Sequence, residues 1–577
     1  MIPFVPATAD QLLAIKVNAG IDELASHARF SAAEPDLVEA IVEGVGAFAA
    51  GEFAPLNRLG DSEGAKLENG QVRLPEGFAE AYAGYVEQGW NAIAGPEAFG
   101  GQGLPFTLAT AVLENLGTAN MAFTLLPILS VGAIEALAHH GSPAQQALYL
   151  PKLVSGKWSG TMNLTEPNAG SDVGALRATA QPILEGTHEG KYRIAGTKIF
   201  ITWGDHDLAE NIVHLVLARL PGAPAGSRGI SLFVVPKFHV NADGSLGPRN
   251  DVRAVGLEHK LGIHASPTCV MSFGYGSGSG GECIGELVGA ENRGLAAMFT
   301  MMNNARVNVG SQGVQIGERA TQQALAYARE RVQGARDGQG AAIIEHPDVR
   351  RMLLRMTALT EGARALLYYT AGQIDRGSLG DGAAGVRAEV LVPLLKAWGT
   401  DIGVEVASLG VQVHGGMGFV EETGAAQHYR DARIAPIYEG TNGIQAADLV
   451  TRKLALEGGE AVMVLISEII RQSVDEPALA QLGEACGQAA HFMRDASLDD
   501  RLAGSVPFCT MMAVAVAGWQ LLRQLRSFTD GAPPAKHASA RFFLDRIVPE
   551  ASGLFAGATA GAGGLYAVSA ELLAQRN

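Results

Sequence analysis

The chain has 577 residues, of which 47% are hydrophobic and 18% charged, and its formal net charge is -16. This length predicts several domains, and the composition is that of a folded, core-rich protein rather than a disordered one. The negative net charge argues against binding a polyanion through a general electrostatic field, so we expect no nucleic-acid partner.

The cysteines and the N-terminus both indicate a reducing compartment. Cys269, Cys283, Cys486 and Cys509 show no CxxC spacing and no accompanying histidine pattern, so they predict neither a metal site nor a disulfide framework. The N-terminus lacks a charged segment followed by an apolar run, and it lacks the arginine-rich character of a transit peptide. We therefore expect a cytoplasmic protein with buried or partly buried thiols.

Helical periodicity dominates residues 1–156. It is clear in 37–43 and in 133–140, where Gly141 follows the last periodic residue. The breaker-rich stretch 95–105 predicts a loop long enough to touch a ligand. These patterns indicate an N-terminal helical domain.

Residues 157–288 change to short runs of β-branched and aromatic residues, such as 192–202 and 230–235. These runs predict a β-rich, barrel-like middle domain. The stretch 276–281 matches the GxGxxG pattern of dinucleotide-binding folds, but no amphipathic helix follows it. We interpret it as a flexible loop.

Residues 289–458 carry four long helical patterns, near 294–332, 347–376, 385–413 and 443–457. A helix rises 1.5 Å per residue, so the first would span roughly 58 Å, a length that only a large bundle accommodates. A C-terminal four-helix bundle is the natural assembly of these helices.

Residues 459–577 add more helical segments, which we interpret as an additional C-terminal helical domain. Their apolar segment 506–519 is shorter than the about 20 residues needed to cross a bilayer, so we expect a buried helix and no membrane span. The predicted fold class is multidomain α+β, in the order helical, β, helical bundle, helical.

The octapeptide 438–445, Tyr-Glu-Gly-Thr-Asn-Gly-Ile-Gln, places one carboxylate between an aromatic residue and a glycine, just before a helical segment. The helix N-terminus favours the Glu439 anion by about 0.3–1 kcal/mol, whereas full burial can raise the pKa of a carboxyl group by up to ~3–5. Desolvation therefore wins in a closed site, and such a glutamate can take a proton from carbon near neutral pH. A helix cap or a pair with Arg433 is the alternative interpretation.

The stretch 162–172, Met-Asn-Leu-Thr-Glu-Pro-Asn-Ala-Gly-Ser-Asp, supplies hydroxyls and exposed amides inside the β region. Such donors suit the edge of a flat heteroaromatic group with several acceptors. The strand 198–202 would place Phe200 against a ring face and Thr202 against a ring nitrogen. A turn and a hairpin without a ligand would explain either segment alone.

Together these segments resemble the flavin-dependent acyl-CoA dehydrogenase family over roughly residues 80 to 455. The motifs Thr-Glu-Pro-x-Ala-Gly-Ser-Asp at 165–172 and Tyr-Glu-Gly-Thr at 438–441 carry the resemblance. The tail from about 460 is similar to the extra domain of larger bacterial members, including those that act on 3-methylmercaptopropionyl-CoA. The resemblance implies non-covalent FAD, an acyl-CoA substrate and an electron-transferring flavoprotein as electron acceptor.

The resemblance also implies roles by position. Glu439 matches the catalytic base, and the substrate-side positions are Ser171, Arg306, Tyr438 and Gly440. The positions that match cofactor contacts are Met162, Leu164, Thr165, Gly170, Ser171, Phe200, Ile201, Thr202, Arg331, Gln412, Gly415, Gly416, Thr441 and Asn442. Arg331 and 412–416 match groups that reach the FAD of a neighbouring subunit, so a homodimer or homotetramer is expected.

Several functions stay open within the family. A dehydrogenase that acts on a 3-methylthiopropionyl or straight-chain acyl-CoA fits every motif, and an acyl-CoA oxidase would share the half-reaction but use oxygen for reoxidation. A non-catalytic DNA-binding member is disfavoured because the tail carries acidic residues and no basic run. A nitroalkane oxidase would carry aspartate at position 439.

Overall fold

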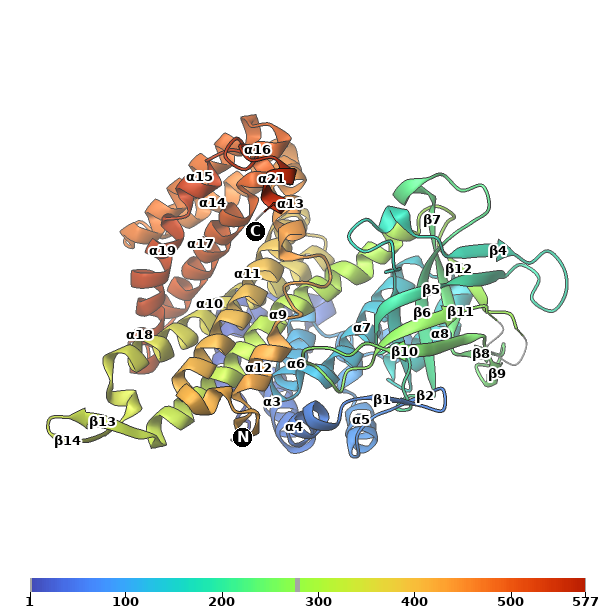
Figure 1. The fold of residues 1–577 in the computed structure, drawn as a ribbon, viewed down its shortest axis with the longest axis horizontal. Coiled ribbons are helices and arrows are strands. Elements are labelled where there is room, and N and C mark those ends of the chain that lie inside the picture. Colours follow the sequence, from blue (N-terminus) through green and yellow to red (C-terminus); the bar gives the residue numbers. More distant parts are fainter. Residues whose placement is uncertain (1–2, 276–280, 576–577) are drawn as a thin grey trace. The chain divides into compact units, whose positions relative to one another are not determined.

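The computed structural model describes residues 3–275 and 281–575, and the chain forms two compact units (Figure 1). Unit 1 comprises Met1–Gly46, Pro105–Thr118 and Arg306–Asn577, and unit 2 comprises Ala47–Leu104 and Ala119–Ala305. The chain is a helix-rich multidomain α+β protein, as predicted. The domain boundaries after residues 156, 288 and 458 stay a prediction. The glycine-rich stretch 276–281 lies almost wholly outside the described residues.

Unit 2 contains an eight-stranded sheet in the order β10-β11-β5-β12-β7-β6-β3, with β4 paired to β5 and β6. The strands are β3 (Trp158–Asn163), β4 (Thr179–Pro182), β5 (Tyr192–Thr202), β6 (Asn211–Arg219), β7 (Ile230–Pro236), β10 (Val252–Leu257), β11 (Thr268–Phe273) and β12 (Ile284–Val288). The β-rich prediction is confirmed. Closure into a barrel is not confirmed, because no pairing joins the end strands β10 and β3 among the described residues.

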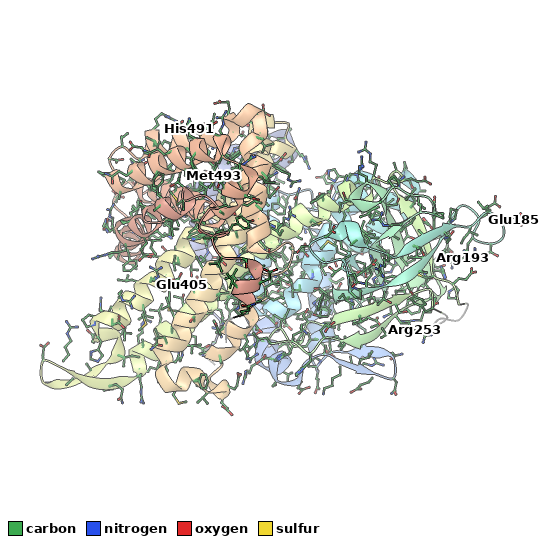
Figure 2. All side chains as sticks on the ribbon, turned by 45° about the horizontal axis from the view of Figure 1, so that its top comes forward. Glu185, Arg193, Arg253, Glu405, His491 and Met493 are labelled. Carbon is green, nitrogen blue, oxygen red and sulfur yellow. The ribbon has the colours of Figure 1, made fainter. Side chains whose placement is uncertain are left out.

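Most strand pairs are antiparallel, whereas β3 and β4 run parallel to β6. Figure 2 shows Glu185 at the outer end of the connection between β4 and β5, and Arg193 on β5. The helices and short strands of unit 2 are α4 (Ala54–Glu63), β1 (Lys66–Glu68), β2 (Gln71–Arg73), α5 (Phe78–Glu87), α7 (Met121–His140), α8 (Pro143–Val154), β8 (Phe238–Val240) and β9 (Leu246–Arg249). The β1–β2 hairpin interrupts the region predicted to be helical.

The central strands β6 and β7 are buried on both faces, which explains their nearly continuous apolar sequence. Side chains alternate along a strand, so Val213 and Leu215 enter one core together with residues of α7 and α8, while Val216 enters the opposite core. The sheet is therefore a rigid base for the segments at its edges.

Unit 1 is built on long helices. They are α9 (Gly294–Glu330, in unit 1 from Arg306 on), α10 (Pro347–Ser378), α11 (Gly382–His414) and α13 (Asn442–Thr451). The first three match the predicted helices, but the fourth ends at Thr451 and continues only as a 3-10 segment, Lys453–Gly459. Glu457 and Gly458 adopt left-handed conformations there, which a continuous helix excludes.

The other helices of unit 1 surround these four. They are α1 (Thr8–Ala14), α2 (Ile21–Ala25), α3 (Pro35–Phe48), α6 (Phe106–Ala119), α12 (Ala425–Ala432), α14 (Glu460–Gln472), α15 (Pro477–Asp495), α16 (Leu498–Ala503), α17 (Ser505–Arg526), α18 (Pro534–Phe542), α19 (Val548–Ser552), α20 (Phe555–Ala558) and α21 (Ala570–Ala574). The helical prediction for the C-terminal region is thereby confirmed, and a short exposed hairpin, β13 (Val332–Arg336) with β14 (Gln339–Ala342), follows α9.

Helices α9 and α11 cross in backbone contact. A Cβ atom added to Gly313 would lie 1.7 Å from the carbonyl oxygen of Gly399, and one added to Gly403 would lie 2.7 Å from Cα of Gly313. Only residues without a side chain permit this approach. The crossing therefore fixes the spacing of the two helices.

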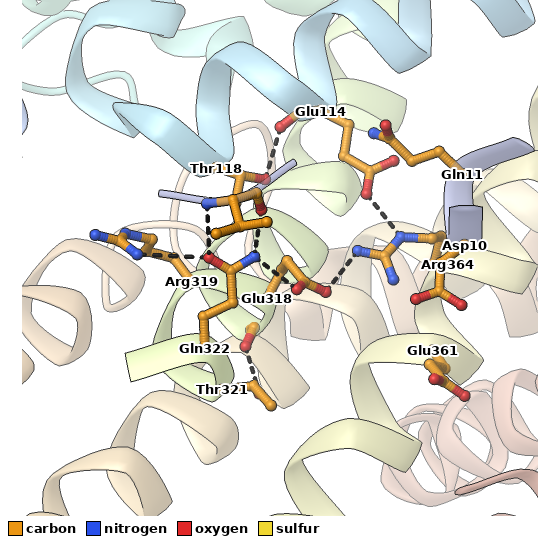
Figure 3. A network of polar contacts seen from close by, with 12 residues as sticks. Asp10, Gln11, Glu114, Thr118, Glu318, Arg319, Thr321, Gln322, Glu361 and Arg364 are labelled. Atoms are coloured by element: carbon orange, nitrogen blue, oxygen red, sulfur yellow. Dashed lines mark hydrogen bonds and ion pairs between the residues drawn. The ribbon is translucent and has the colours of Figure 1, made fainter. Parts of the chain in front are cut away.

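A buried charge cluster joins helices α6, α9 and α10 of unit 1 (Figure 3). Arg364 on α10 donates to Glu114 on α6 at 2.7 Å and to Glu318 on α9 at 2.8 Å. The Tyr368 hydroxyl also donates to Glu114, at 2.7 Å. These carboxylates hold the pKa of Arg364 well above its ordinary value. Each buried charge has a partner, which such burial requires.

Among the residues that the structure describes, two helices are long and apolar enough to cross a membrane by length and composition, Met121–His140 and Ser505–Ser527, with mean hydropathies of 1.8 and 1.5. In both, 83% of the apolar window is buried inside the protein, as is typical of core helices. The four cysteines are free and buried, as predicted, and burial raises the pKa of each thiol, to about 12 for Cys269 and Cys509.

Candidate active site

The segment that carries Glu439 is a strained loop between α12 and α13. Glu439 has a φ of 56° and Gly440 a φ of 83°, so two successive residues adopt the left-handed conformation. A non-glycine residue in that conformation costs about 1–3 kcal/mol and persists only where its surroundings enforce it. Thr441 then caps α13, because its hydroxyl accepts a hydrogen bond from the Ile444 amide at 3.2 Å.

Side chains of unit 1 enforce this conformation. The Glu439 carbonyl accepts hydrogen bonds from Gln445 Nε2 at 3.2 Å and from Arg306 Nε at 3.4 Å. The preceding residue is fixed as well, because the Tyr438 hydroxyl donates to Gln312 on α9. The structure therefore brings the predicted residues Arg306, Tyr438 and Glu439 together.

Burial dominates the electrostatics of Glu439. It raises the pKa of the carboxyl group from 4.5 to about 7, against the opposing effects of Arg306 and Lys396. This outcome matches the predicted balance, in which desolvation exceeds the stabilisation of the anion. The alternative of an ion pair with Arg433 is not seen among the described residues, so the carboxylate stays available to a ligand.

The residues predicted to reach a neighbouring subunit's cofactor lie at exposed ends of helices. Arg331 follows the last residue of α9, and Gln412, Gly415 and Gly416 lie at the C-terminal end of α11. His414 between them is buried, stacks on Tyr327 with ring centroids 4.4 Å apart, and lies 2.7 Å from the Gly410 carbonyl oxygen. It is thus a packing residue.

In unit 2, the loop after β3 is tied to β5 by a buried lysine. Lys198 donates to the Leu164 carbonyl at 3.0 Å and to Glu166 Oε1 at 2.7 Å. Glu166 also accepts from the amides of Arg177 and Ala178, at 2.6 and 3.0 Å. These contacts tie the start of the loop, with the predicted residues Leu164 and Thr165, to the strand, and the predicted residues Gly170 and Ser171 lie exposed further along the same loop.

The end of β5 presents groups that fit a flat cofactor. Phe200 has a φ of 59° and is 58% exposed, although its neighbour Ile201 is buried. The hydroxyls of Thr165, Ser171 and Thr202 make no side-chain hydrogen bond within the described part of the chain. An exposed ring beside uncommitted donors suits a flavin edge. These residues, with Met162 and Leu164, would hold FAD in unit 2.

Three residues near Glu439 have no role predicted from the sequence: Gln312, Lys396 and Gln445. Lys396 carried a signal, because it is the single charge in the apolar run 390–398 of α11. Asn442, predicted as a cofactor contact, directs its side chain to α11, where Nδ2 donates to Asp401 at 2.7 Å and to the Ala397 carbonyl at 2.9 Å. Its contact with FAD stays a prediction.

Comparison with known proteins assigns most of the chain. Four family models match in order: the N-terminal domain of acyl-CoA dehydrogenases at residues 36–157, the middle domain at 161–274, the C-terminal domain at 292–454 and an acetyl-CoA dehydrogenase C-terminal-like domain at 471–569. The last match covers most of the tail that was predicted to be the extra domain of larger family members.

Individual relatives agree with these models. The chain is 50% identical to a 3-methylmercaptopropionyl-CoA dehydrogenase of Ruegeria pomeroyi, over 90% of each chain. It is 33% identical to a broad-specificity linear acyl-CoA dehydrogenase of Mycobacterium tuberculosis, over 94% of this chain and 95% of that one. Its fold matches an FAD complex of an acyl-CoA dehydrogenase from Bacillus anthracis with a TM-score of 0.74 and 21% identity, covering 91% of this chain and 88% of that one. The chain therefore belongs to the acyl-CoA dehydrogenase family of FAD-dependent oxidoreductases.

Proposed function

We propose that this chain removes one hydrogen from each of the α and β carbons of an acyl-CoA thioester and releases the 2-enoyl-CoA. The first candidate substrate is 3-methylmercaptopropionyl-CoA, because the relative of that name is 50% identical over 90% of both chains. Straight-chain acyl-CoAs are the second candidate, since the 33% identical relative is described as acting on linear acyl groups.

The observation that carries the proposal is the half-buried Glu439, whose carboxyl group has a pKa of about 7. At neutral pH a large fraction of the carboxyl groups is ionised, and each is basic enough to accept the α-proton. FAD, when bound, supplies the acceptor for the β-hydrogen and its electron pair. The α-proton goes to Glu439, and the electrons of the Cα–H bond form the new double bond.

The loop conformation contributes to the same step. The backbone N–H of Glu439 would donate to the thioester carbonyl, which gains negative charge as the α-proton leaves. The left-handed φ of Glu439 sets the direction of this N–H, and the hydrogen bonds from Arg306 and Gln445 hold it. Acidification of the α-carbon and proton acceptance therefore depend on one residue.

The partners follow from the same assignment. We propose electron-transferring flavoprotein as the electron acceptor, on the basis of family membership. The exposed Arg331, Gln412, Gly415 and Gly416 support a homodimer or homotetramer in which each chain completes the cofactor site of another. A cytoplasmic location without a membrane-spanning segment is part of the proposal, supported by the burial of both long apolar helices.

Anaerobic flavin bleaching tests the proposal. The FAD-loaded protein is mixed with 3-methylmercaptopropionyl-CoA and, separately, with straight-chain acyl-CoAs of increasing length. We expect rapid loss of the yellow colour with the preferred substrate, and no bleaching by any acyl-CoA would overturn the proposed reaction. Reoxidation of the bleached enzyme then separates the acceptors: fast recovery with air alone indicates an oxidase, whereas recovery that needs electron-transferring flavoprotein indicates a dehydrogenase.

A further inference from the structure

Lys396 is a fully buried cation in the middle of α11, with none of its surface exposed. It lies in the apolar run Val390–Trp398, one turn before the Gly399 crossing with α9. An ammonium group in such a place costs several kcal/mol unless hydrogen bonds satisfy it. Its surroundings therefore need to compensate the buried charge.

The Lys396 ammonium points at the loop that carries Glu439. Its Nζ donates to the Gly440 carbonyl at 2.7 Å and to Asn442 Oδ1 at 2.9 Å. Both acceptors are neutral, and Lys396 forms no ion pair within the described residues. No carboxylate among the described residues therefore neutralises its positive charge through direct contact.

Asn442 extends this contact into a clamp. Its Oδ1 accepts from Lys396. Its Nδ2 donates to the Ala397 carbonyl and to Asp401 Oδ1. The first residue of α13 is thus bound to α11 on both sides of its side-chain amide, which ties the end of the 439–442 segment to that helix.

The charges around Glu439 come from three helices. Arg306 on α9 and Lys396 on α11 both lower the pKa of Glu439, while burial raises it. Asp448 on α13 and Arg452 directly after it act on Arg306, and Asp401 on α11 acts on Lys396. Burial lowers the pKa of Lys396 to about 8, so the side chain is mostly charged at pH 7.

We infer that Lys396 is a positioning residue for Glu439: it holds the strained loop through Gly440 and Asn442, and its ammonium keeps the Glu439 carboxylate ionised near neutral pH. This inference rests on the proposed role of Glu439 as the base. The hydrogen bonds to the loop and the charge effect on Glu439 can be separated by substitution. Glutamine at position 396 keeps a hydrogen-bond donor without a charge, whereas methionine keeps neither.

The first test measures the rate of flavin reduction against pH in Lys396→Met and Lys396→Gln. We expect the apparent pKa of the rate to rise in both variants, so that activity at pH 7 falls about tenfold and recovers in part at higher pH. A further loss of rate at all pH values is expected only in Lys396→Met. The control is Lys536→Met, which removes another largely buried lysine of unit 1, paired with Asp10 and Glu361. It should leave the pH profile unchanged.

The second test needs neither substrate nor turnover. Glu439→Gln should raise the thermal stability of the protein progressively between pH 4.5, where Glu439 of the unfolded chain ionises, and about 7, where Glu439 of the folded chain ionises, because desolvation makes the anion the destabilising form. We expect this stabilisation to level off at a higher pH in the Lys396→Met background than in the wild type, because loss of the ammonium group raises the pKa of Glu439 in the folded chain. The same levelling-off pH in both backgrounds, together with an unshifted rate profile, would overturn the role of Lys396. Retained flavin reduction in Glu439→Gln would instead overturn the proposed base.

Discussion

Unit 2 and unit 1 each fix a loop with a fully buried lysine, Lys198 on β5 and Lys396 on α11. In both, burial lowers the pKa of the ammonium to about 8. Their acceptors differ: Lys198 contacts a carbonyl and the Glu166 carboxylate, whereas Lys396 contacts a carbonyl and the Asn442 amide. The first lysine is neutralised where it lies, and the second keeps a charge that acts on Glu439.

This difference matches the tasks of the two loops. A loop that binds a cofactor needs a constant shape, which a closed ion pair with extra backbone donors provides. A loop that carries a base also needs the protonation state of that base to be set near neutral pH. An unneutralised ammonium serves both purposes, because it holds the backbone and favours the carboxylate.

Glu439→Gln removes the group on which the charge of Lys396 acts, and we expect the largest effect from it. Flavin reduction should fall about 10²–10⁴-fold, the usual contribution of a general base, while FAD stays bound. In the wild type, the rate should rise with pH through about 7, since only the ionised carboxyl group accepts a proton. Stopped-flow bleaching measures both quantities. The exposed Glu389→Gln serves as the control, and a matching loss there would contradict the assignment.

Lys198→Met tests the closed ion pair of unit 2. It leaves the buried Glu166 without its cation, so we expect a loss of about 3–5 kcal/mol in the free energy of unfolding. Lys396→Met leaves no directly paired carboxylate without its cation. We therefore expect a smaller loss in the free energy of unfolding, about 1–3 kcal/mol. Denaturant titration of both variants decides the matter. Equal losses would mean that the two lysines differ in neighbours but not in role.

Gly313→Ala tests the helix crossing that brings Gln312 and Arg306 of α9 to the loop beside Lys396. The new methyl group would meet the Gly399 carbonyl at 1.7 Å, so the helices need to separate. We expect about 1–3 kcal/mol of destabilisation and a lower rate of flavin reduction. Gly382→Ala, at the start of α11 with no atom within 4 Å of the added carbon, is the matched control. Wild-type unfolding of Gly313→Ala would refute the close crossing.

Phe200→Ala should have the smallest effect and should concern the cofactor alone. Its ring is 58% exposed, so stability of the protein without FAD should hardly change. Loss of an aromatic contact worth about 0.5–1.5 kcal/mol should weaken FAD binding about two- to tenfold. Fluorescence titration with FAD measures this change. Leu246→Ala, another exposed apolar residue of unit 2, provides the comparison, and equal weakening in both variants would remove Phe200 from the site.

The sequence was most informative where a pattern is local. Periodicity located α9, α10 and α11, and the residues around Glu439 sufficed to predict that burial would outweigh the helix dipole. Lys396 could not be assigned in the same way, because its acceptors Gly440 and Asn442 lie 44 and 46 residues further along the chain. Only the packing of α13 on α11 brings them together.

Other features depend on the backbone. The left-handed conformations of Phe200 and Glu439 leave no mark in composition, since residues with a Cβ atom adopt them only under tertiary constraint. The predicted helix 443–457 ends at Thr451, and the 3-10 segment that follows leaves helical geometry at Leu456, Glu457 and Gly458. Closure of the sheet also depends on contacts between strands distant in the chain. The alternation of apolar and polar residues within each strand does not specify these contacts.

The four buried thiols have a practical consequence. Alkylating and oxidising reagents attack thiolates, and these cysteines are shielded from solvent with their pKa values raised. The natural cysteines of the folded chain should therefore react only slowly with thiol-directed labelling reagents. A single cysteine introduced at an exposed position, such as Glu389, would take a spectroscopic label selectively, and movement of unit 1 during turnover could then be followed without first removing any natural cysteine.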